Sequence, residues 1–558
     1  MKRNLSELAD KKFDIVIIGG GSFGACAAWD ASLRGLSVAL LERGDFCQAT
    51  SANHFKIVHG GIRYLQHLDI KRVRESSKER NALLRIAPHL VKPLPIVVPT
   101  YGYGLKSKAV LSVGFKMYDA ITFDRNDGID DQSRMIPASS TISRSQTLKL
   151  FPELNADGLT GAGIFADGQM INPPRLVLSF VRSSVEMGAT VANYVEAKKF
   201  LMRGDRVIGV EAQDRQTGET FEVRGKVVLN SAGPWAERLL DQHSNLKLHP
   251  VQTFSRDACF IVKKQLSGKY GLAVSGRTSD PDAILSREQR HLFIAPWRNY
   301  SLIGVWHVVY GGDPDQITVT PDNLSTFLGE INDAYPQLDL GLKDIIRWNA
   351  GLTLFGENKA GSVNLSYGKR SVLYDHAREN NVEGLLTLIG VRATTARGMA
   401  EKAVSLSLAK MDKKAPASKT AETQLFGGKI DNFDSFVRQK RQSCSTMLET
   451  ETVTALSRNY GSAISEVLKY NQTDDKLMQR IGSTATIKAE IVYAVHEEMA
   501  QHLTDVVYRR TDLASGAYPG DEAIRTCAEI MGKEMGWDPS RQASEVAAVK
   551  KVFQGVEV

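Results

Sequence analysis

Three glycines and one acid near the amino end have the types and the spacing that hold a dinucleotide. Gly19, Gly21 and Gly24 fit the pattern G-x-G-x-x-G. The first glycine permits a tight turn, the second lets a pyrophosphate approach the backbone, and the third lets strand and helix pack closely, with the helix N-terminus facing the phosphates. Glu42 closes the next predicted strand, where a carboxylate hydrogen-bonds the ribose hydroxyls and disfavours the 2′-phosphate of NADP. The pattern predicts FAD or NAD, and a glycine-rich turn without a ligand is the alternative.

A second stretch, residues 50–64, reads TSANHFKIVHGGIRY and begins shortly after the ribose-binding strand. An extended flavin would continue there towards its isoalloxazine ring, so the stretch favours FAD over NAD. Small residues and paired glycines let a backbone lie against a flat ring, and a nearby cation would stabilise the negative charge that arrives with a hydride. The residues of this stretch that we expect to bind FAD are Thr50, Ser51, Lys56, His59, Gly60 and Gly61.

A βαβ unit must position these residues, and the apolar pattern predicts one. Residues 13–18 form a continuous apolar run typical of a strand buried on both faces, residues 22–33 are compatible with a helix, and residues 37–41 form a second buried strand. A charge-rich helix is expected over residues 70–86. Further expected elements are a hairpin of 206–212 and 220–224, strands at 226–230, 258–262, 291–295, 301–306 and 385–389, and helical patterns at 395–411, 487–507 and 523–535.

Length and composition limit the kind of protein. A chain of 558 residues needs two or three domains, and residues 410–423, charged and without periodicity, have the composition of a linker. The net charge of +7, without a block of basic residues, gives no reason to expect nucleic acid. Five scattered cysteines fit reduced thiols in a cytoplasmic protein and no metal site. Because no run of 18 apolar residues occurs, we expect no membrane-spanning helix, and peripheral membrane contact stays open.

Longer stretches of the chain resemble the FAD-dependent glycerol-3-phosphate dehydrogenase family, within the larger group of D-amino-acid-oxidase-like flavoproteins. The family pattern S-x-x-K-L-I-H-G-G-x-R-Y-L is matched at residues 56–65, which read KIVHGGIRYL. The family's N-A-x-G-P-W is matched by NSAGPW at 230–235. FIAPW at 293–297 and DVVYRRT at 505–511 extend the match. The resemblance covers almost the whole chain.

This resemblance implies an α/β architecture, in which a Rossmann-like FAD-binding domain carries an inserted mixed-sheet substrate domain and is followed by an all-α C-terminal domain. The implied FAD-binding segments are 12–90, 161–245 and 346–412, the substrate-domain segments are 91–160 and 246–345, the linker is 413–431, and the helical domain is 432–558. The resemblance also implies further FAD-binding residues, which are Gly233, Trp235, Gly390, Arg392, Ala393 and Thr394.

Several substrate-site positions depart from the family pattern. The family's G-x-R-P-L falls on residues 351–354, GLTL, so a guanidinium that would clamp a phosphate dianion is missing. The family's G-T-T-D falls on residues 304–307, GVWH, where Trp306 would change the shape of the pocket. A histidine expected near the start of strand 258–262 is replaced by Cys259, and Arg392 stands where the family has a lysine.

The resemblance implies that a substrate CH–OH group gives hydride to flavin N5 while a base takes the hydroxyl proton. Given the departures, we expect a polyol- or glycerol-derived substrate other than glycerol 3-phosphate, bound by Arg63, Arg290 and Thr353. The catalytic candidates are His307, Tyr64 and Arg63. His59 is a further candidate for the base, although we favour a place for it in the loop that supports the flavin.

Electrons would then pass to a quinone or to oxygen. Residues 104–118 mix basic and apolar side chains, and they would lie either on the inner face of a membrane or against the protein core. A homodimer and a covalent link from the flavin to a histidine or cysteine stay open. Three rival functions also stay open: an authentic glycerol-3-phosphate dehydrogenase, a flavoenzyme that oxidises C–N bonds of amines or amino acids, and a non-catalytic flavin-binding scaffold.

Overall fold

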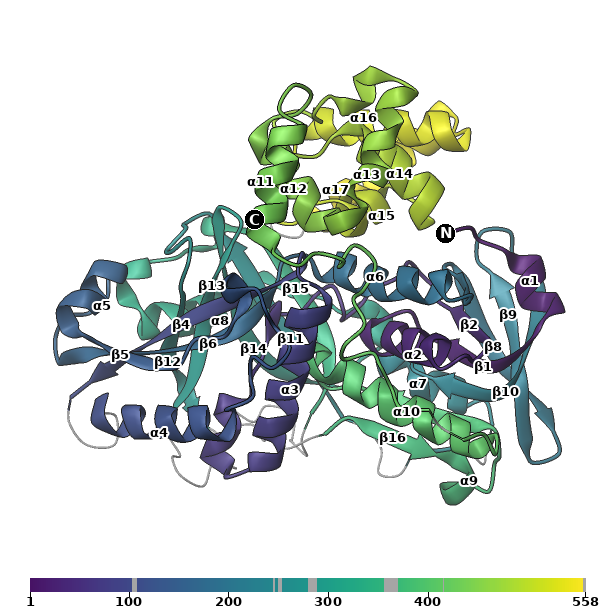
Figure 1. The fold of residues 1–558 in the computed structure, drawn as a ribbon, viewed down its shortest axis with the longest axis horizontal. Coiled ribbons are helices and arrows are strands. Elements are labelled where there is room, and N and C mark those ends of the chain that lie inside the picture. Colours follow the sequence, from purple (N-terminus) through teal and green to yellow (C-terminus); the bar gives the residue numbers. More distant parts are fainter. Residues whose placement is uncertain are drawn as a thin grey trace.

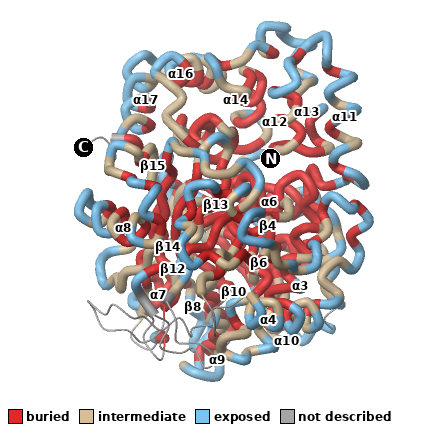
Figure 2. The backbone as a smooth tube through the Cα atoms, turned by 90° about the vertical axis from the view of Figure 1, so that its left-hand side faces the viewer, coloured by how far each residue is buried: buried red, intermediate tan, exposed pale blue. Residues whose placement is uncertain are grey.

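The computed structural model describes residues 1–102, 108–243, 246–248, 253–279, 289–355, 370–414 and 416–554. Two β-sheets lie side by side, and a group of helices from the end of the chain lies across the top of the view (Figure 1). Buried residues concentrate in the two sheets and in the helices packed on them (Figure 2). No helix in the described ranges is long and apolar enough to cross a membrane.

The first sheet has eight strands and contains the expected βαβ unit. Its strands are β1 (Lys12–Ile18), β2 (Val38–Leu41), β7 (Thr190–Ala192), β8 (Val195–Arg203), β9 (Arg206–Asp214), β10 (Thr220–Asn230), β16 (Val372–Asp375) and β17 (Leu385–Ile389). The order β17-β10-β1-β2-β7 is parallel, and β8, β9 and β16 add antiparallel pairs. Its helices are α1 (Leu5–Asp10), α2 (Ser22–Leu33), α6 (Pro173–Glu186), α7 (Ala236–Leu240), α9 (His376–Glu379) and α10 (Ala396–Lys410).

Strand β1 lies at the centre of this sheet and is buried on both faces. Ile15 and Ile17 pack against α2, α6 and α10, whereas Val16 and Ile18 belong to the core on the opposite face. Because both faces are covered, the strand needs apolar side chains at successive positions rather than at alternate ones. This is the physical reason that the run at 13–18 could be recognised in the sequence.

The second sheet has nine strands and is mixed, with the order β15-β11-β14-β13-β12-β4-β6-β3 and β5 paired to β6. Its strands are β3 (Ile57–Val58), β4 (Val91–Tyr101), β5 (Ser140–Ser143), β6 (Leu159–Met170), β11 (Phe254–Val262), β12 (Gly271–Ser279), β13 (Gln289–Trp297), β14 (Tyr300–Tyr310) and β15 (Ile345–Leu354). The helices around it are α3 (Ile70–Ile86), α4 (Lys108–Ile121), α5 (Arg144–Leu150) and α8 (Pro321–Ala334). One face packs on α8, where Phe260 of β11 meets Phe327 at 4.7 Å between ring centroids.

The chain passes from one sheet to the other at residues that differ from the predicted boundaries of the domain segments. The predicted second FAD-binding segment starts at 161, yet β6 (Leu159–Met170) pairs within the second sheet. The predicted third segment starts at 346, yet β15 (Ile345–Leu354) also pairs within the second sheet. Sheet pairing depends on distant residues, so the local sequence pattern of these two strands does not reveal which sheet they join. The division into domains stays a prediction.

The C-terminal helices form their own core above the two sheets (Figure 1). They are α11 (Phe433–Ser443), α12 (Thr450–Tyr460), α13 (Ile464–Leu468), α14 (Lys488–Glu498), α15 (Leu503–Asp505), a π-helix (Val506–Arg510), α16 (Asp521–Met535) and α17 (Pro539–Gln554). The preceding predicted linker packs on α3, beside the second sheet, and on α6, beside the first sheet. Leu425 N–H donates to the Ile86 carbonyl at 2.9 Å, and Phe426 N–H donates to Ser183 Oγ at 2.8 Å.

Residues 505–516, here called the bridging segment, connect the C-terminal helices to both sheets. Arg510 donates through both terminal nitrogens to the Asp45 carboxylate at 2.7 Å, and Arg509 donates to the same group at 2.6 Å. On the second sheet, Trp297 Nε1–H donates to the Ser515 carbonyl at 2.5 Å, and Arg347 donates to the Ala514 carbonyl. The bridging segment therefore touches the end of β2 and the strands β13 and β15.

Candidate functional site

A cavity of about 1280 Å³ lies between the two sheets and contains most of the predicted site residues. The predicted residues on its wall are Gly19, Gly21, Glu42, Thr50, Ser51, Lys56, His59, Arg63, Gly233, Trp235, Arg290, His307, Thr353, Gly390, Arg392, Ala393 and Thr394. Within the described ranges, four predicted residues do not line it: Gly24, Gly60, Gly61 and Tyr64. The cavity thus brings together predicted residues that lie as far apart in the sequence as Gly19 and Thr394.

The glycine motif forms the turn between β1 and α2, and each glycine has a steric reason. Gly19 has a φ of +101°, a region that side chains rarely adopt. A Cβ on Gly24 would lie 1.9 Å from the Gly19 carbonyl oxygen, so only glycine lets α2 approach β1 this closely. A Cβ on Gly21 would occupy the cavity wall 3.0 Å from Ser51 Oγ. Such a bare backbone at a helix N-terminus fits the pyrophosphate of FAD.

Glu42 lies at the end of β2, as the sequence predicts, and its own loop holds it in place. Gly20 N–H donates to Oε2 at 2.6 Å, and Gly44 N–H donates to Oε1 at 2.8 Å. Burial raises the pKa of this carboxyl, and the two N–H groups act against that shift. The fixed carboxylate faces the cavity where the ribose of an ADP group would lie.

The end of the cavity beyond Glu42 is closed by Trp235 and a group of charges that the sequence reasoning did not select. The Arg43 guanidinium lies over the Trp235 ring at 4.6 Å. Trp235 Nε1–H donates to Asp315 at 2.8 Å, and Arg238 donates to the same carboxylate at 2.6 Å. Burial would raise the pKa of Asp315, but the hydrogen bonds from the two arginines lower it below its ordinary value. These side chains form a flat, charged end wall suited to an adenine and its ribose.

The turn at His59 and Gly60 lies on the flavin side of the cavity, and Asp167 of β6 organises it. Gly60 N–H donates to Asp167 Oδ1 at 2.7 Å, and His59 Nδ1 lies 3.3 Å from Oδ2. Arg80, fully buried, donates to Oδ1 at 3.0 Å, and His59 N–H donates to Thr394 Oγ1 at 3.1 Å. Gly60 and Gly61 thus shape the turn from behind the wall. Asp167 is a functional residue that sequence reasoning missed.

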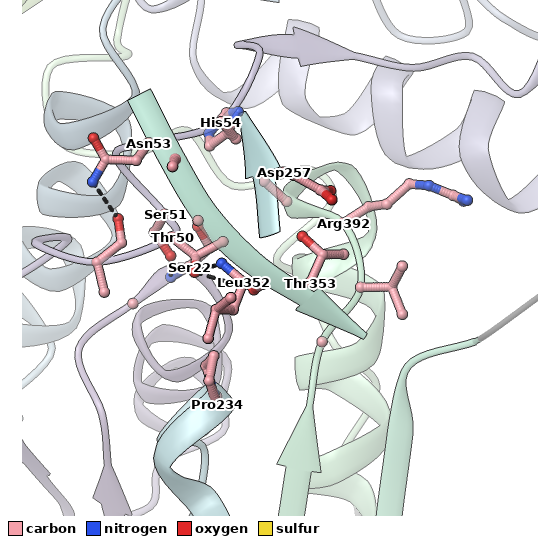
Figure 3. Close-up of a pocket in the computed structure, with 18 of the residues that line it drawn as sticks. Ser22, Thr50, Ser51, Asn53, His54, Pro234, Asp257, Leu352, Thr353 and Arg392 are labelled. Atoms are coloured by element: carbon pink, nitrogen blue, oxygen red, sulfur yellow. Dashed lines mark hydrogen bonds between the residues drawn. The ribbon is translucent and has the colours of Figure 1, made fainter. Parts of the chain in front are cut away.

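Lys56 is buried on the cavity wall, and its backbone has a φ of +63°. Its ammonium lies 5.0 Å from the centre of the Trp297 ring and 3.3 Å from the His54 carbonyl oxygen. Burial lowers the pKa of this amine to about 8. Thr50, also predicted to bind FAD, uses its hydroxyl to bridge to the second sheet: it donates to the Leu352 carbonyl at 3.1 Å and accepts from the Leu352 N–H at 3.0 Å (Figure 3).

Arg63 and Arg392 bring two positive charges together at the cavity wall. Burial lowers the pKa of Arg392 to about 10, and the neighbouring charge of Arg63 adds to that shift. The Tyr64 ring lies behind them, with Arg392 at 4.8 Å and Arg72 at 5.4 Å from its centre. Adjacent cations of this kind make a binding place for an anion. Tyr64 is placed to support Arg392 from outside the cavity rather than to meet a ligand.

The substrate-facing wall is formed by three neighbouring strands of the second sheet. Asp257 of β11 lies opposite His307 of β14 and opposite Gly351 of β15. His307 Nδ1 and Asp257 Oδ1 are 2.7 Å apart. Thr353 lies one row along the same face, and Figure 3 shows Arg392 pointing away from both Asp257 and Thr353. Asp257 is the second acid of the candidate site that sequence reasoning missed, and it lies two residues before Cys259 on the same face of β11.

Three other positions that the sequence singles out lie in three different surroundings. Trp306 stacks on Phe327 of α8 at 5.9 Å, so much of its bulk belongs to the core behind the wall. Cys259 lies on the cavity wall, and burial raises the pKa of its thiol. Arg290 of β13 lines the cavity, and its carbonyl oxygen lies beside Gly276 of β12.

Comparison with known proteins gives consistent matches over the chain. A family described as FAD dependent oxidoreductase matches residues 14–365. A second family, described as C-terminal domain of alpha-glycerophosphate oxidase, matches residues 418–542. Both matches agree with the division of the molecule into a two-sheet body and a group of C-terminal helices.

Individual relatives and structures point the same way. The chain is 30% identical to glycerol-3-phosphate dehydrogenase of Synechocystis sp. over 551 residues, which cover 96% of this chain and 95% of that protein. It is 30% identical to the mitochondrial glycerol-3-phosphate dehydrogenase of Homo sapiens over 570 residues, with 97% and 73% covered. The structure of glycerol-3-phosphate dehydrogenase from Bacillus halodurans, complexed with FAD, superposes with a TM-score of 0.77 at 22% identity, covering 99% and 96% of the two chains. This last likeness shows the fold.

Proposed function

The chain belongs to the FAD-dependent oxidoreductase family, and from this premise we propose that it oxidises a CH–OH group of a polyol- or glycerol-derived anion. It is an enzyme with FAD as its cofactor, and it resembles glycerol-3-phosphate dehydrogenases over its full length. FAD supplies the hydride acceptor. The chain's own residues bind the cofactor, orient the substrate and take the proton.

The observation that carries the proposal is the continuity of the cavity. One end is the glycine turn with Glu42, which fits an ADP group, and the other end is the wall that carries Asp257 and His307. Thr50 fastens the FAD loop to β15, and Gly351 leaves room for it, since a Cβ there would lie 3.0 Å from the Thr50 Cα. A cofactor that extends along the cavity from the glycine turn therefore brings its reactive end to the wall where polar side chains face it.

The charges on the wall support an anionic substrate with a neutral, hydroxyl-bearing part. Arg63 and Arg392 would bind the anion, and Arg290 also lines the cavity. Thr353 and Asp257 stand on the strand face away from the Arg392 guanidinium, where they can hydrogen-bond hydroxyl groups (Figure 3). A bidentate arginine at position 353 would favour a phosphate there, whereas threonine suits an uncharged oxygen.

Anaerobic bleaching of the bound flavin tests this function. We expect a phosphorylated polyol larger than glycerol 3-phosphate, such as erythritol 4-phosphate, to bleach the flavin faster than glycerol 3-phosphate, and free glycerol to be slowest because it lacks the anion. Arg63→Gln should raise the concentration needed for half-maximal bleaching by about tenfold or more, since a charge-assisted hydrogen bond is worth about 1.5–3 kcal/mol. FAD content should stay unchanged.

The same panel separates the rival functions. Rapid bleaching by glycerol 3-phosphate alone would make the protein an authentic glycerol-3-phosphate dehydrogenase. Bleaching by glycine or L-proline, but by no alcohol, would indicate oxidation of a C–N bond. Bleaching by dithionite alone would indicate a flavin-binding scaffold and would refute the proposed oxidation.

We further propose that the protein delivers electrons to a membrane quinone from a bilayer surface, with oxygen as the alternative acceptor. Helix α4 buries Phe115 and Tyr118 against the protein, yet its opposite face exposes Val110, Val113 and Met117. Four of the ten large hydrophobic side chains that are exposed in the described ranges lie on α4 or just after it in the chain, namely Val110, Val113, Met117 and Phe123. Two more, Leu68 and Ile70, lie just before and at the start of α3, which contacts α4. Part of the predicted stretch 104–118, residues 104–107, lies outside the described residues. Assembly as a homodimer stays a prediction.

A charge on this face should prevent membrane binding. We expect Met117→Glu to reduce cosedimentation with vesicles containing anionic lipid by about tenfold, because burying a large apolar side chain stabilises binding by about 1.5–3 kcal/mol. Met187→Glu is the matched control, since Met187 is 52% exposed against 48% for Met117 but lies after α6. Failure of the unmodified protein to bind vesicles of any composition would refute the membrane contact.

A further inference from the structure

We propose that His307 is the base that takes the hydroxyl proton and that Asp257 positions it. This inference rests on the proposed oxidation of a CH–OH group and names the residues that serve it. The position on this wall at which the family resemblance leads us to expect a histidine, in the middle of β11, holds Cys259 instead. A buried thiol whose pKa is raised does not exchange protons with a substrate near neutral pH.

A histidine, His307, lies instead on the neighbouring strand β14, beside Asp257, on the same face of the sheet as Cys259. Cys259 pairs with Gly304 of β14, and Asp257, two residues before it on β11, pairs with His307. Side chains two residues apart on a strand share a face, and neighbouring strands lie about 4.8 Å apart. An imidazole on β14 therefore reaches the part of the cavity that a histidine at position 259 would reach.

Asp257 fixes the orientation of the imidazole. Its Oδ1 accepts a hydrogen bond from Ser255 Oγ at 2.6 Å and lies 2.7 Å from His307 Nδ1. A carboxylate accepts hydrogen bonds, so Nδ1 carries the hydrogen and Nε2 carries the lone pair. The Phe355 ring stacks on the imidazole, with centroids 6.1 Å apart and an angle of 13° between the planes. Asp257 thus holds the imidazole at its edge, and Phe355 packs against its face.

The proton balance of the step is simple. The substrate O–H proton goes to His307 Nε2, the carbon–hydrogen bond breaks with its electron pair going to the flavin, and a C=O bond forms. FAD, when bound, would supply the hydride acceptor, and the quinone or oxygen named above would take up the two electrons. Arg63, Arg290 and Arg392, which line the same cavity, would bind the anionic group of the substrate and are not proton acceptors.

His59 also has a carboxylate partner on the cavity wall, but its surroundings give it another role. Asp167 shares its Oδ1 between Gly60 N–H and the buried Arg80, so its charge is already compensated by that arginine. The His59 backbone is held by Thr394. This pair stabilises the turn where the flavin would lie, whereas Asp257, within the described part of the chain, accepts side-chain hydrogen bonds from Ser255 and His307.

Two measurements on the FAD-loaded enzyme test the inference. In ¹⁵N spectra of histidine-labelled protein, neutral His307 should carry its hydrogen on Nδ1, and Asp257→Asn should shift that hydrogen towards Nε2, since the carboxylate acceptor is lost. In anaerobic bleaching with the fastest compound of the polyol panel, His307→Asn should slow flavin reduction by about 10²–10⁴-fold. Asp257→Asn should slow it by about 10²-fold.

His496→Asn is the matched control, because His496 also lies 2.7 Å from a carboxylate, that of Glu534, but on the C-terminal helices. It should leave the rate unchanged. An unchanged bleaching rate in His307→Asn, or a His307 tautomer that does not respond to Asp257→Asn, would overturn the inference. If no compound bleaches the flavin, the proposed oxidation fails, while the ¹⁵N spectra still decide whether the pair exists.

Discussion

The Gly24→Ala variant is expected to fold but to bind FAD about 5- to 150-fold more weakly than the unmodified protein. Gly24 does not line the cavity, so a loss of affinity would act through the backbone. The added Cβ would lie 1.9 Å from the Gly19 carbonyl oxygen and 2.7 Å from Ser231 Oγ. Relief requires α2 to move away from β1, which displaces the N–H groups that face the pyrophosphate. Overpacking of this kind costs about 1–3 kcal/mol, and each 1.4 kcal/mol is about tenfold in a dissociation constant.

The flavin content per mole of purified protein and a fluorescence titration with FAD measure this effect. Gly329→Ala in α8 is the matched control, because it makes the same change in a helix with no atom within 4 Å of the new Cβ. That variant should keep its FAD and gain stability by up to about 1 kcal/mol, since alanine favours helices over glycine. Unweakened FAD binding in Gly24→Ala would show that the close approach of α2 to β1 is not needed for the cofactor.

Replacing Asp45 by alanine is expected to destabilise the protein by about 3–5 kcal/mol, the usual cost of removing one partner from a buried ion pair. Asp45 is fully buried and accepts from Arg509, Arg510 and Asn193. Arg509 keeps a second partner, Asp505, at 2.6 Å, but Arg510 loses its carboxylate at a buried site. Unfolding in urea, followed by tryptophan fluorescence with FAD in excess, measures the change.

The contribution of Asp45 should depend on pH in a defined direction. Burial would raise the pKa of this carboxyl, but the charges of Arg510 and Arg509 outweigh burial and hold the pKa below its ordinary value. The ionised group therefore stabilises the fold fully above its unfolded pKa of about 3.9, and this stabilisation falls as the pH drops towards the folded pKa. The difference between Asp45→Ala and the unmodified protein should shrink in the same range.

Glu222→Ala is the control for this variant, since Glu222 pairs with Arg224 at the surface, where both side chains are about half exposed. Surface pairs contribute little to stability, so this variant should unfold like the unmodified protein. An Asp45→Ala variant as stable as Glu222→Ala would mean that the contact between β2 and the bridging segment adds nothing to the fold.

Much of the fold could be predicted because its signals are local. The helices α2 and α3 begin and end at the predicted residues, 22–33 and 70–86, and β17 matches the predicted strand 385–389. A strand buried on both faces needs a continuous apolar run, and glycine or proline near its end marks where the pattern stops. The FAD-binding fold and the resemblance to glycerol-3-phosphate dehydrogenases are likewise confirmed by the comparisons.

The acids that organise the site could not be found in this way. Asp167 acts on His59 from 108 residues away, and Asp257 acts on His307 from 50 residues away. Each lies on a strand whose neighbour in the sheet is set by tertiary pairing, which no local pattern encodes. Tyr64 shows the opposite case: it belongs to a recognised motif, yet it lies in the short 3-10 helix Ile62–His67 and does not line the cavity, and its ring contacts Arg72 and Arg392.

The bridging segment has a consequence for how this protein can be shortened or recombined. It holds the end of β2 through Asp45 and holds β13 and β15 through Trp297 and Arg347. The bridging segment therefore fixes the spacing between the first sheet, which carries the nucleotide-binding turn, and the second sheet, which carries the proposed substrate wall. A chain that ends before the last helices would leave Asp45 and Arg347 without these hydrogen-bond partners. A C-terminal domain taken from another protein would have to supply equivalents of Arg509 and Arg510 and of the Ala514 and Ser515 carbonyl groups.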